Sequence, residues 1–78
     1  MNIDEVVKTI AEIEALAGFE YRSAQGVLRY GQCLFNATFD IVPDIANKIR
    51  GSSTDPFYVD HIIPKFFTQL EEFLLEEI

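Results

Sequence analysis

The residues best suited to proton transfer in this sequence lie in one segment, DPFYVDH, which contains Asp55, Phe57, Tyr58, Asp60 and His61. Carboxylates beside an imidazole can act as general acids and bases, and a tyrosine beside a carboxylate is common in binding surfaces. Catalysis would also need a nucleophile or a metal, and the segment provides neither. We therefore expect no enzymatic activity, and the segment is either a partner-binding site or a structural turn with helix caps.

Four glutamates near the end of the chain form a second candidate site, and they are Glu71, Glu72, Glu76 and Glu77. On a helix they would lie at the negative end of the dipole, which is unfavourable by roughly 0.3–1 kcal/mol per charge at low salt. Such a cluster is either a patch for a basic partner or a solvated helix end that keeps the protein soluble. Solvated ends are the more common case, and both interpretations stay open for these glutamates.

A third candidate is a polar strip on one predicted helix, formed by Arg29, Gln32, Cys33 and Asn36. Arg29, Cys33 and Asn36 share a helical face, and Gln32 lies one turn from Asn36. These residues either bind a ligand or make structural contacts within the fold. In the structural interpretation, which we prefer, Arg29 pairs with a carboxylate, Asn36 caps a neighbouring loop and Cys33 is a small buried hydrophobe.

Composition excludes several functional classes. One cysteine and one histidine fall short of a four-ligand zinc site, so we predict no metal and no cofactor. The acidic N-terminus and the short apolar runs are not typical of a signal peptide or a membrane span, so we expect a cytoplasmic protein that does not bind membranes. A net charge of −7 repels phosphate backbones, which argues against direct nucleic-acid binding and against a helix–turn–helix at residues 24–50. The acidity favours a basic protein partner instead.

The first predicted helix is defined by its capping signals and by apolar residues three and four apart. Asn2 and Glu5 form a capping-box pattern that begins a helix over residues 3–17. Gly18 can end this helix in the left-handed conformation. Residues 19–22 then follow as a loop.

Three further helices are predicted. Ser23 is expected to cap the second, which contains two glycines, Gly26 and Gly31. Each glycine inside a helix costs roughly 1 kcal/mol relative to alanine, so we expect close packing of another element there. A short third helix begins at Pro43 and ends at Gly51.

Asp60 is expected to cap the last helix, over residues 61–76. The pattern as a whole predicts an all-α fold, a small irregular helical bundle of three main helices plus a short one. It forms a single helical domain over residues 1–78.

Five segments of the central region resemble a widespread set of short, uncharacterised phage, prophage and bacterial proteins, and they are RYGQ (29–32), LFNA (34–37), PDIANKIRG (43–51), DPFY (55–58) and IPKF (63–66). The resemblance covers about half the chain. It implies a mobile-element or host-accessory setting and transfers no catalytic residue. It also implies a small protein that acts by binding a larger one.

These patterns together predict a non-enzymatic protein-interaction module, of the kind a phage or prophage uses to modulate a host protein, binding through an acidic surface. The alternative is a structural homo-oligomer such as a homodimer. It would pair through an apolar stripe formed by Phe66, Phe67, Phe73 and Leu74.

Overall fold

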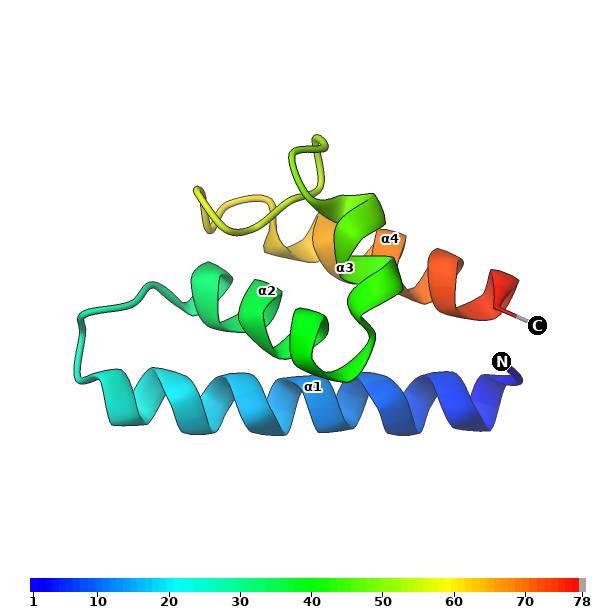
Figure 1. Cartoon of the computed structure of the whole chain (residues 1–78), viewed down its shortest axis with the longest axis horizontal. Helices are drawn as coiled ribbons and strands as arrows, with labels where there is room; N and C mark the ends of the chain where they lie inside the picture. Colours follow the sequence, from blue (N-terminus) through cyan, green and yellow to red (C-terminus); the bar gives the residue numbers. More distant parts are fainter. Residues whose placement is uncertain (78) are drawn as a thin grey trace.

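The computed structural model describes residues 1–77, and over that range it contains four α-helices and no strand. They are α1 (Ile3–Ala24), α2 (Tyr30–Ile41), α3 (Pro43–Ile49) and α4 (Ile63–Glu76). The long helix α1 forms one side of the molecule, and α2 runs back along it in the opposite direction (Figure 1). α1 packs against α2 and α4, and α3 packs against α2 and α4 as well. The predicted all-α fold, a small irregular bundle, is confirmed.

Helix α1 begins as predicted but ends at Ala24 rather than at residue 17. Asn2 and Glu5 form the expected capping box. Gly18 does not end the helix, because the actual stop is the left-handed pair Gln25 (φ 50°) and Gly26 (φ 87°). The prediction of a loop at residues 19–22 was therefore wrong.

Helix α2 begins at Tyr30, later than the predicted start after Ser23. Ser23 lies inside α1 and caps nothing, and Gly26 lies in the turn, where a positive φ favours glycine. The backbone N–H of Arg29 donates to Oε1 of Gln32 at 2.9 Å, which satisfies one free donor at the helix start. Of the two glycines, only Gly31 lies within a helix.

The last two helices carry proline in their first turns, as predicted. α3 begins at Pro43 and ends at Ile49, just before Gly51, whose φ of 74° is left-handed. α4 begins at Ile63, so residues 61 and 62 precede it, and Asp60 does not cap it with its side chain. That carboxylate contacts α2 instead.

The core lies where the four helices meet. Its buried side chains include Val6 and Ile13 of α1, Leu34 of α2 and Ile49 of α3. From α4 come Phe66, Leu70 and Leu74, all fully buried. Phe67 and Phe73 are half-buried and pack against the same core.

This packing corrects the predicted homodimer surface. Phe66 and Leu74 have no exposed area and are therefore not part of any surface, whereas Phe67 and Phe73 are half-buried against the core. A partner can reach Phe66 or Leu74 only if the core opens.

The two ends of the described chain lie side by side (Figure 1). The amino nitrogen of Met1 donates to the carbonyl oxygen of Leu74 at 3.2 Å and to that of Glu77. Residue 1 therefore lies against the carbonyl groups at the end of α4. Within residues 1–77, the structure has no helix that is both long and apolar enough to span a membrane.

The free energy of unfolding should depend on pH through Glu20 of α1, which lies near Asp40 of α2. Burial raises the pKa of the Glu20 carboxyl above its ordinary value of 4.5, and Asp40 of α2 adds to the effect. The folded state therefore binds this proton more tightly than the unfolded state does. The contribution to stability is full at low pH and is lost as the pH rises from about 4.5 through the raised pKa.

We expect Glu20→Gln to raise the free energy of unfolding at pH 7 relative to the wild type, and to lose this advantage at pH 4. Urea unfolding at both pH values measures the difference. Glu12→Gln, on the exposed side of α1, controls for the loss of one negative charge from a chain of net charge −7. A stabilisation by Glu20→Gln that is the same at pH 4 and pH 7 would contradict the assignment to carboxyl burial.

Candidate protein-interaction site

The loop between α3 and α4 is held in shape by the side chain of Asp55. Its Oδ2 accepts the backbone N–H of Gly51 at 2.7 Å, and its Oδ1 accepts that of Phe57 at 2.9 Å. Asp55 is only 7% exposed, so these two bonds form in a partly desolvated site. Asp55 therefore organises the loop that carries Phe57 and Tyr58, and its structural interpretation is confirmed.

The same loop is anchored to the start of α2 by Asp60. Oδ1 of Asp60 accepts the backbone N–H of Gly31 at 3.0 Å and forms an ion pair with Nη1 of Arg29 at 3.3 Å. Nη2 of Arg29 also donates to the carbonyl oxygen of Phe57. The ion pair is partly exposed, so by itself it contributes about 0–1 kcal/mol. Its role is geometric, because it fixes the loop on α2 as part of a network.

Gly31 is required by this anchoring. A Cβ at Gly31 would lie 2.2 Å from the carbonyl oxygen of Pro56 and 2.6 Å from Oδ1 of Asp60. No side chain fits at that distance, so the loop can lie against α2 only where α2 has a glycine. The close packing expected around Gly31 from the sequence is therefore confirmed.

A groove of about 310 Å³ lies between the loop, the end of α3 and α2. We call it the aromatic groove, and its lining residues are Phe35, Asn36, Arg50, Gly51, Asp55, Phe57 and Tyr58. The ring of Phe57 meets those of Phe35 and Tyr58 edge to face, with centroids 5.8 and 5.0 Å apart. Tyr58 is 74% exposed, so its ring is open to solvent at the groove.

Arg50 lies beside these rings with its guanidinium stacked on two of them. Its Cζ is 5.5 Å from the centroid of Phe35 and 5.3 Å from that of Phe39. Both distances suit cation–π attraction. Phe39 is 40% exposed, so Arg50 and Phe39 extend the apolar surface beyond the groove.

Comparison with protein families, curated proteins and solved structures found no match.

The structure divides the predicted partner-binding residues into two separate surfaces. Asp55, Phe57 and Tyr58 line the aromatic groove, Asp60 anchors the loop, and His61 is exposed just before α4. The glutamates at 71, 72, 76 and 77 lie in the second half of that helix and at its end, and all four are exposed. Only Glu76 and Glu77 lie a full helix length from the loop, about 20 Å for 14 residues at 1.5 Å each.

The polar strip predicted on α2 is mostly structural. Arg29 and Gln32 are used in the contacts at the start of the helix, and Cys33 is fully buried. Burial raises the pKa of the Cys33 thiol, and the charges of Glu20 and Asp60 raise it further, so the thiol is a poor nucleophile. The predicted pairing of Arg29 with a carboxylate and the burial of Cys33 are confirmed. Asn36 lines the aromatic groove.

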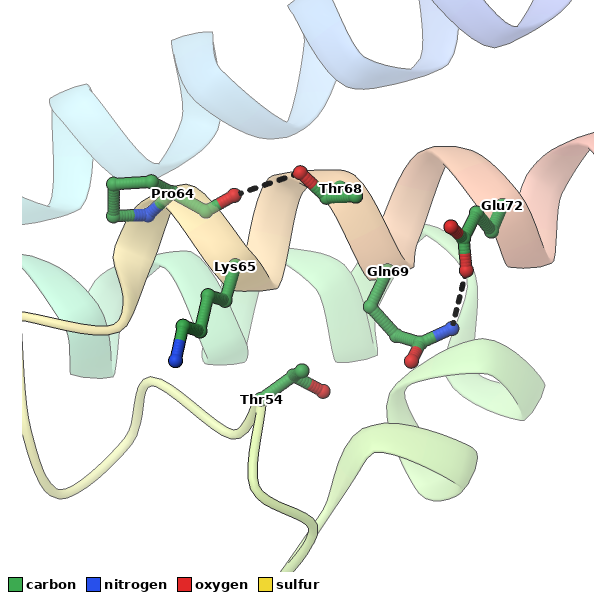
Figure 2. A pocket seen from close by; sticks show the side chains of 6 residues that line it. All are labelled: Thr54, Pro64, Lys65, Thr68, Gln69 and Glu72. Carbon is green, nitrogen blue, oxygen red and sulfur yellow. Dashed lines mark hydrogen bonds between the residues drawn. The ribbon is translucent and has the colours of Figure 1, made fainter.

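A second hollow of about 360 Å³ lies between the loop and α4. Its walls are Thr54, Pro64, Lys65, Thr68, Gln69 and Glu72, shown in Figure 2. The Thr68 hydroxyl donates to the carbonyl of Pro64 at 3.1 Å, and Nε2 of Gln69 donates to Glu72 at 3.4 Å. No aromatic side chain lines this hollow, so it has no large apolar anchor for a partner.

Sequence reasoning missed three residues of the site: Phe35, Phe39 and Arg50. Phe35 and Phe39 are one helical turn apart, a spacing that is also typical of an apolar stripe facing the core. Arg50 is the residue directly after α3, and its guanidinium lies over the two aromatic rings of α2. The spacing could have suggested the aromatic pair, but only the fold shows that Arg50 stacks on it.

Within residues 1–77, no three or more His, Cys, Asp or Glu side chains are arranged to hold a metal ion. The aromatic groove offers a ligand its aromatic rings, one guanidinium and the polar groups of Asn36 and Tyr58. This is the composition of protein-binding hot spots, in which Tyr and Arg are enriched.

Proposed function

We propose that this chain is a non-enzymatic protein-interaction module whose binding surface is the aromatic groove. The observation that carries the proposal is the exposed ring of Tyr58, presented by a loop that Asp55 and Asp60 hold in place. Leaving a tyrosine this exposed forgoes apolar burial that a small domain needs. A partner that covers the ring would recover that burial.

The construction of the loop supports high affinity for such a partner. Three contacts fix the backbone around Phe57, namely those made by Asp55, Arg29 and Asp60. A surface that is already ordered loses less conformational entropy when it binds. The loop is therefore suited to recognition of a partner without prior rearrangement.

The resemblance to short phage, prophage and bacterial proteins supports a role as a modulator of a host protein. Three of the five segments that carry it line the groove, with Phe35 and Asn36 from LFNA, Arg50 and Gly51 from PDIANKIRG, and Phe57 and Tyr58 from DPFY. A fourth, RYGQ, contributes Gly31, against which the loop packs. All of α1 and the acidic end of α4 lie outside those segments. The groove is thus the feature that this resemblance favours as the working surface.

The acidity has a supporting role in the proposal. A net charge of −7 attracts a partner that is basic overall and speeds the encounter, in a way that salt screens. The exposed glutamates at 71, 72, 76 and 77 contribute to this attraction from the far end of α4.

A comparison of variants in capture from a bacterial lysate tests the proposal. The tagged chain is compared with Tyr58→Ala, with a quadruple Gln variant at residues 71, 72, 76 and 77, and with Val27→Ala as control. Val27 is an exposed apolar residue outside the groove. We expect a protein that the wild type and the Val27 variant retain equally and that Tyr58→Ala retains at least about 10-fold less, as expected for a hot-spot residue.

The quadruple variant locates the contribution of the acidic end. We expect weaker capture at low salt and little change at high salt, because the effect is long-range attraction. Capture that Tyr58→Ala leaves unchanged but the quadruple Gln variant abolishes would contradict the groove and move the binding surface to the acidic end.

A homodimer is the second candidate function, and exposed apolar residues of α1 favour it. Ile3 and Val7 are one turn apart on the outer side of α1, and both are largely exposed. Sedimentation at micromolar concentration, with Val7→Lys as a variant, tests this candidate. A wild-type dimer that the substitution dissociates would support it, and a monomer throughout would exclude it.

A further inference from the structure

We propose that the aromatic groove recognises a peptide segment of the partner that carries a carboxylate next to an apolar side chain, and that Arg50 pairs with this carboxylate. The inference rests on the proposed function, and it adds the chemical class of the segment that is bound.

Arg50 is a cation without a carboxylate partner in the described part of the chain. The chain has 13 acidic and six Lys or Arg residues, yet the one ion pair formed within residues 1–77 joins Arg29 to Asp60. Arg50 instead lies over Phe35 and Phe39, and it is exposed. Its hydrogen-bond donors are available to a ligand in the groove that it lines.

Stacking prepares the guanidinium for a planar anion. The two rings restrict the side chain of Arg50, so less rotamer entropy is lost when a ligand binds. A carboxylate matches the fork of guanidinium N–H groups and can accept two parallel hydrogen bonds. Lysine at this position would offer only a point charge, so the geometry favours a ligand group that is planar and bidentate.

Asp55 determines where that carboxylate can lie. Asp55 also lines the groove, and both of its oxygens already accept backbone N–H groups. A second carboxylate near it would be repelled, so the negative group of the ligand pairs with the Arg50 guanidinium and avoids the Asp55 carboxylate. The rings of Phe57 and Tyr58 then receive an apolar side chain, and the amide of Asn36 is available to the peptide backbone.

The experiment uses a library of random nine-residue peptides displayed on phage and selected against the full chain. The peptide selected most strongly is then synthesised with a fluorescein label, and its affinity is measured by fluorescence anisotropy. The protein variants are Arg50→Gln, Arg50→Lys, Tyr58→Ala and, as matched control, Arg22→Gln on α1. Arg22 is exposed, and its substitution causes the same change in net charge.

We expect the selected peptides to share an Asp or Glu beside an aliphatic or aromatic residue. Arg50→Gln should weaken binding about 10- to 100-fold, as for loss of a hydrogen-bonded charge pair, and Arg50→Lys should weaken it less. Arg22→Gln should leave the affinity unchanged. Replacing the acidic residue of the peptide by its amide should weaken binding to the wild type by a similar factor and have little further effect on Arg50→Gln.

Two outcomes overturn the inference, and they differ in what they mean for the proposed function. Peptides that need Tyr58 but show no preference for acidic residues, and bind Arg50→Gln as well as wild type, would refute the carboxylate and leave the groove as a binding surface. A selection that yields no peptide dependent on Tyr58 would refute both. If Arg50→Gln affects folding, replacing the acidic residue of the peptide by its amide still tests the carboxylate, because the wild-type protein is used.

Discussion

Replacing Gly31 by alanine is expected to lower the free energy of unfolding by about 2–4 kcal/mol, although alanine is the better helix former. The new Cβ would lie 2.2 Å from the carbonyl oxygen of Pro56, so the loop must move away from α2. Overpacking costs about 1–3 kcal/mol and loss of the hydrogen bond to Asp60 about 1.5–3 kcal/mol, against a gain of about 1 kcal/mol in helix propensity. In thermal unfolding followed by circular dichroism, we expect Tm to fall by roughly 10–25 °C.

Gly18→Ala is the matched control for this substitution. Gly18 also lies inside a helix, but the nearest atom to its added Cβ is Nη1 of Arg22 at 3.2 Å, the end of a flexible and exposed side chain. Here the gain in helix propensity dominates, and we expect a stabilisation of about 0.5–1 kcal/mol. The two Gly→Ala changes are thus expected to have opposite signs. A Gly31 variant as stable as the wild type would show that the loop does not need to lie against α2.

The Gly31 variant also connects the fold to the proposed function. The loop that it displaces carries Phe57 and Tyr58, which form one wall of the aromatic groove. We therefore expect Gly31→Ala to weaken partner capture even at temperatures where the variant is fully folded. Gly18→Ala should leave capture unchanged, because Gly18 lies in α1, which does not line the aromatic groove.

The two glycines show which part of this fold the sequence could predict. Propensity and spacing correctly placed the capping box of Asn2, the proline starts of α3 and α4, and the all-α class. Gly18 was interpreted as a helix end, because local sequence alone cannot show that the packing of α1 continues beyond it. The real stop, at Gln25 and Gly26, depends on two consecutive left-handed residues, of which only the glycine is marked by its type.

Asp60 illustrates the corresponding limit for the candidate site. An aspartate directly before a helix is a good local cap, and the sequence places Asp60 directly before the predicted helix at residues 61–76. In the structure its carboxylate binds Gly31 and Arg29 on α2, which are far away in the sequence. Long-range hydrogen bonds of this kind leave no periodic signal. For the same reason, the stacking of Arg50 on Phe35 and Phe39 was not predicted, whereas the aromatic character of the DPFY segment was.

The second large effect is expected at Asp55. Comparing its Ala and Asn variants distinguishes the loss of the hydrogen bonds that shape the loop from the loss of the negative charge. Asp55→Ala removes the acceptor of two backbone N–H groups, those of Gly51 and Phe57, in a site that is only 7% exposed. An unsatisfied buried donor costs about 1–3 kcal/mol, so we expect a loss of about 2–4 kcal/mol in the free energy of unfolding. Asp55→Asn keeps one acceptor oxygen and places an NH₂ group against the other donor, so we expect an intermediate loss of about 1–2 kcal/mol.

Asp40→Asn is the control for the loss of an aspartate charge. Asp40 is exposed on α2, and its charge raises the pKa of Glu20, so its removal should be neutral or slightly stabilising. Urea unfolding of the wild type, Asp55→Ala, Asp55→Asn and Asp40→Asn ranks their free energies of unfolding. Peptide binding by folded Asp55→Asn then shows whether Tyr58 still contacts its partner. Equal stability of Asp55→Ala and wild type would mean that water satisfies both backbone donors. In that case the loop would not be preorganised by Asp55, and the affinity of the groove would have to come from its aromatic rings and Arg50 alone.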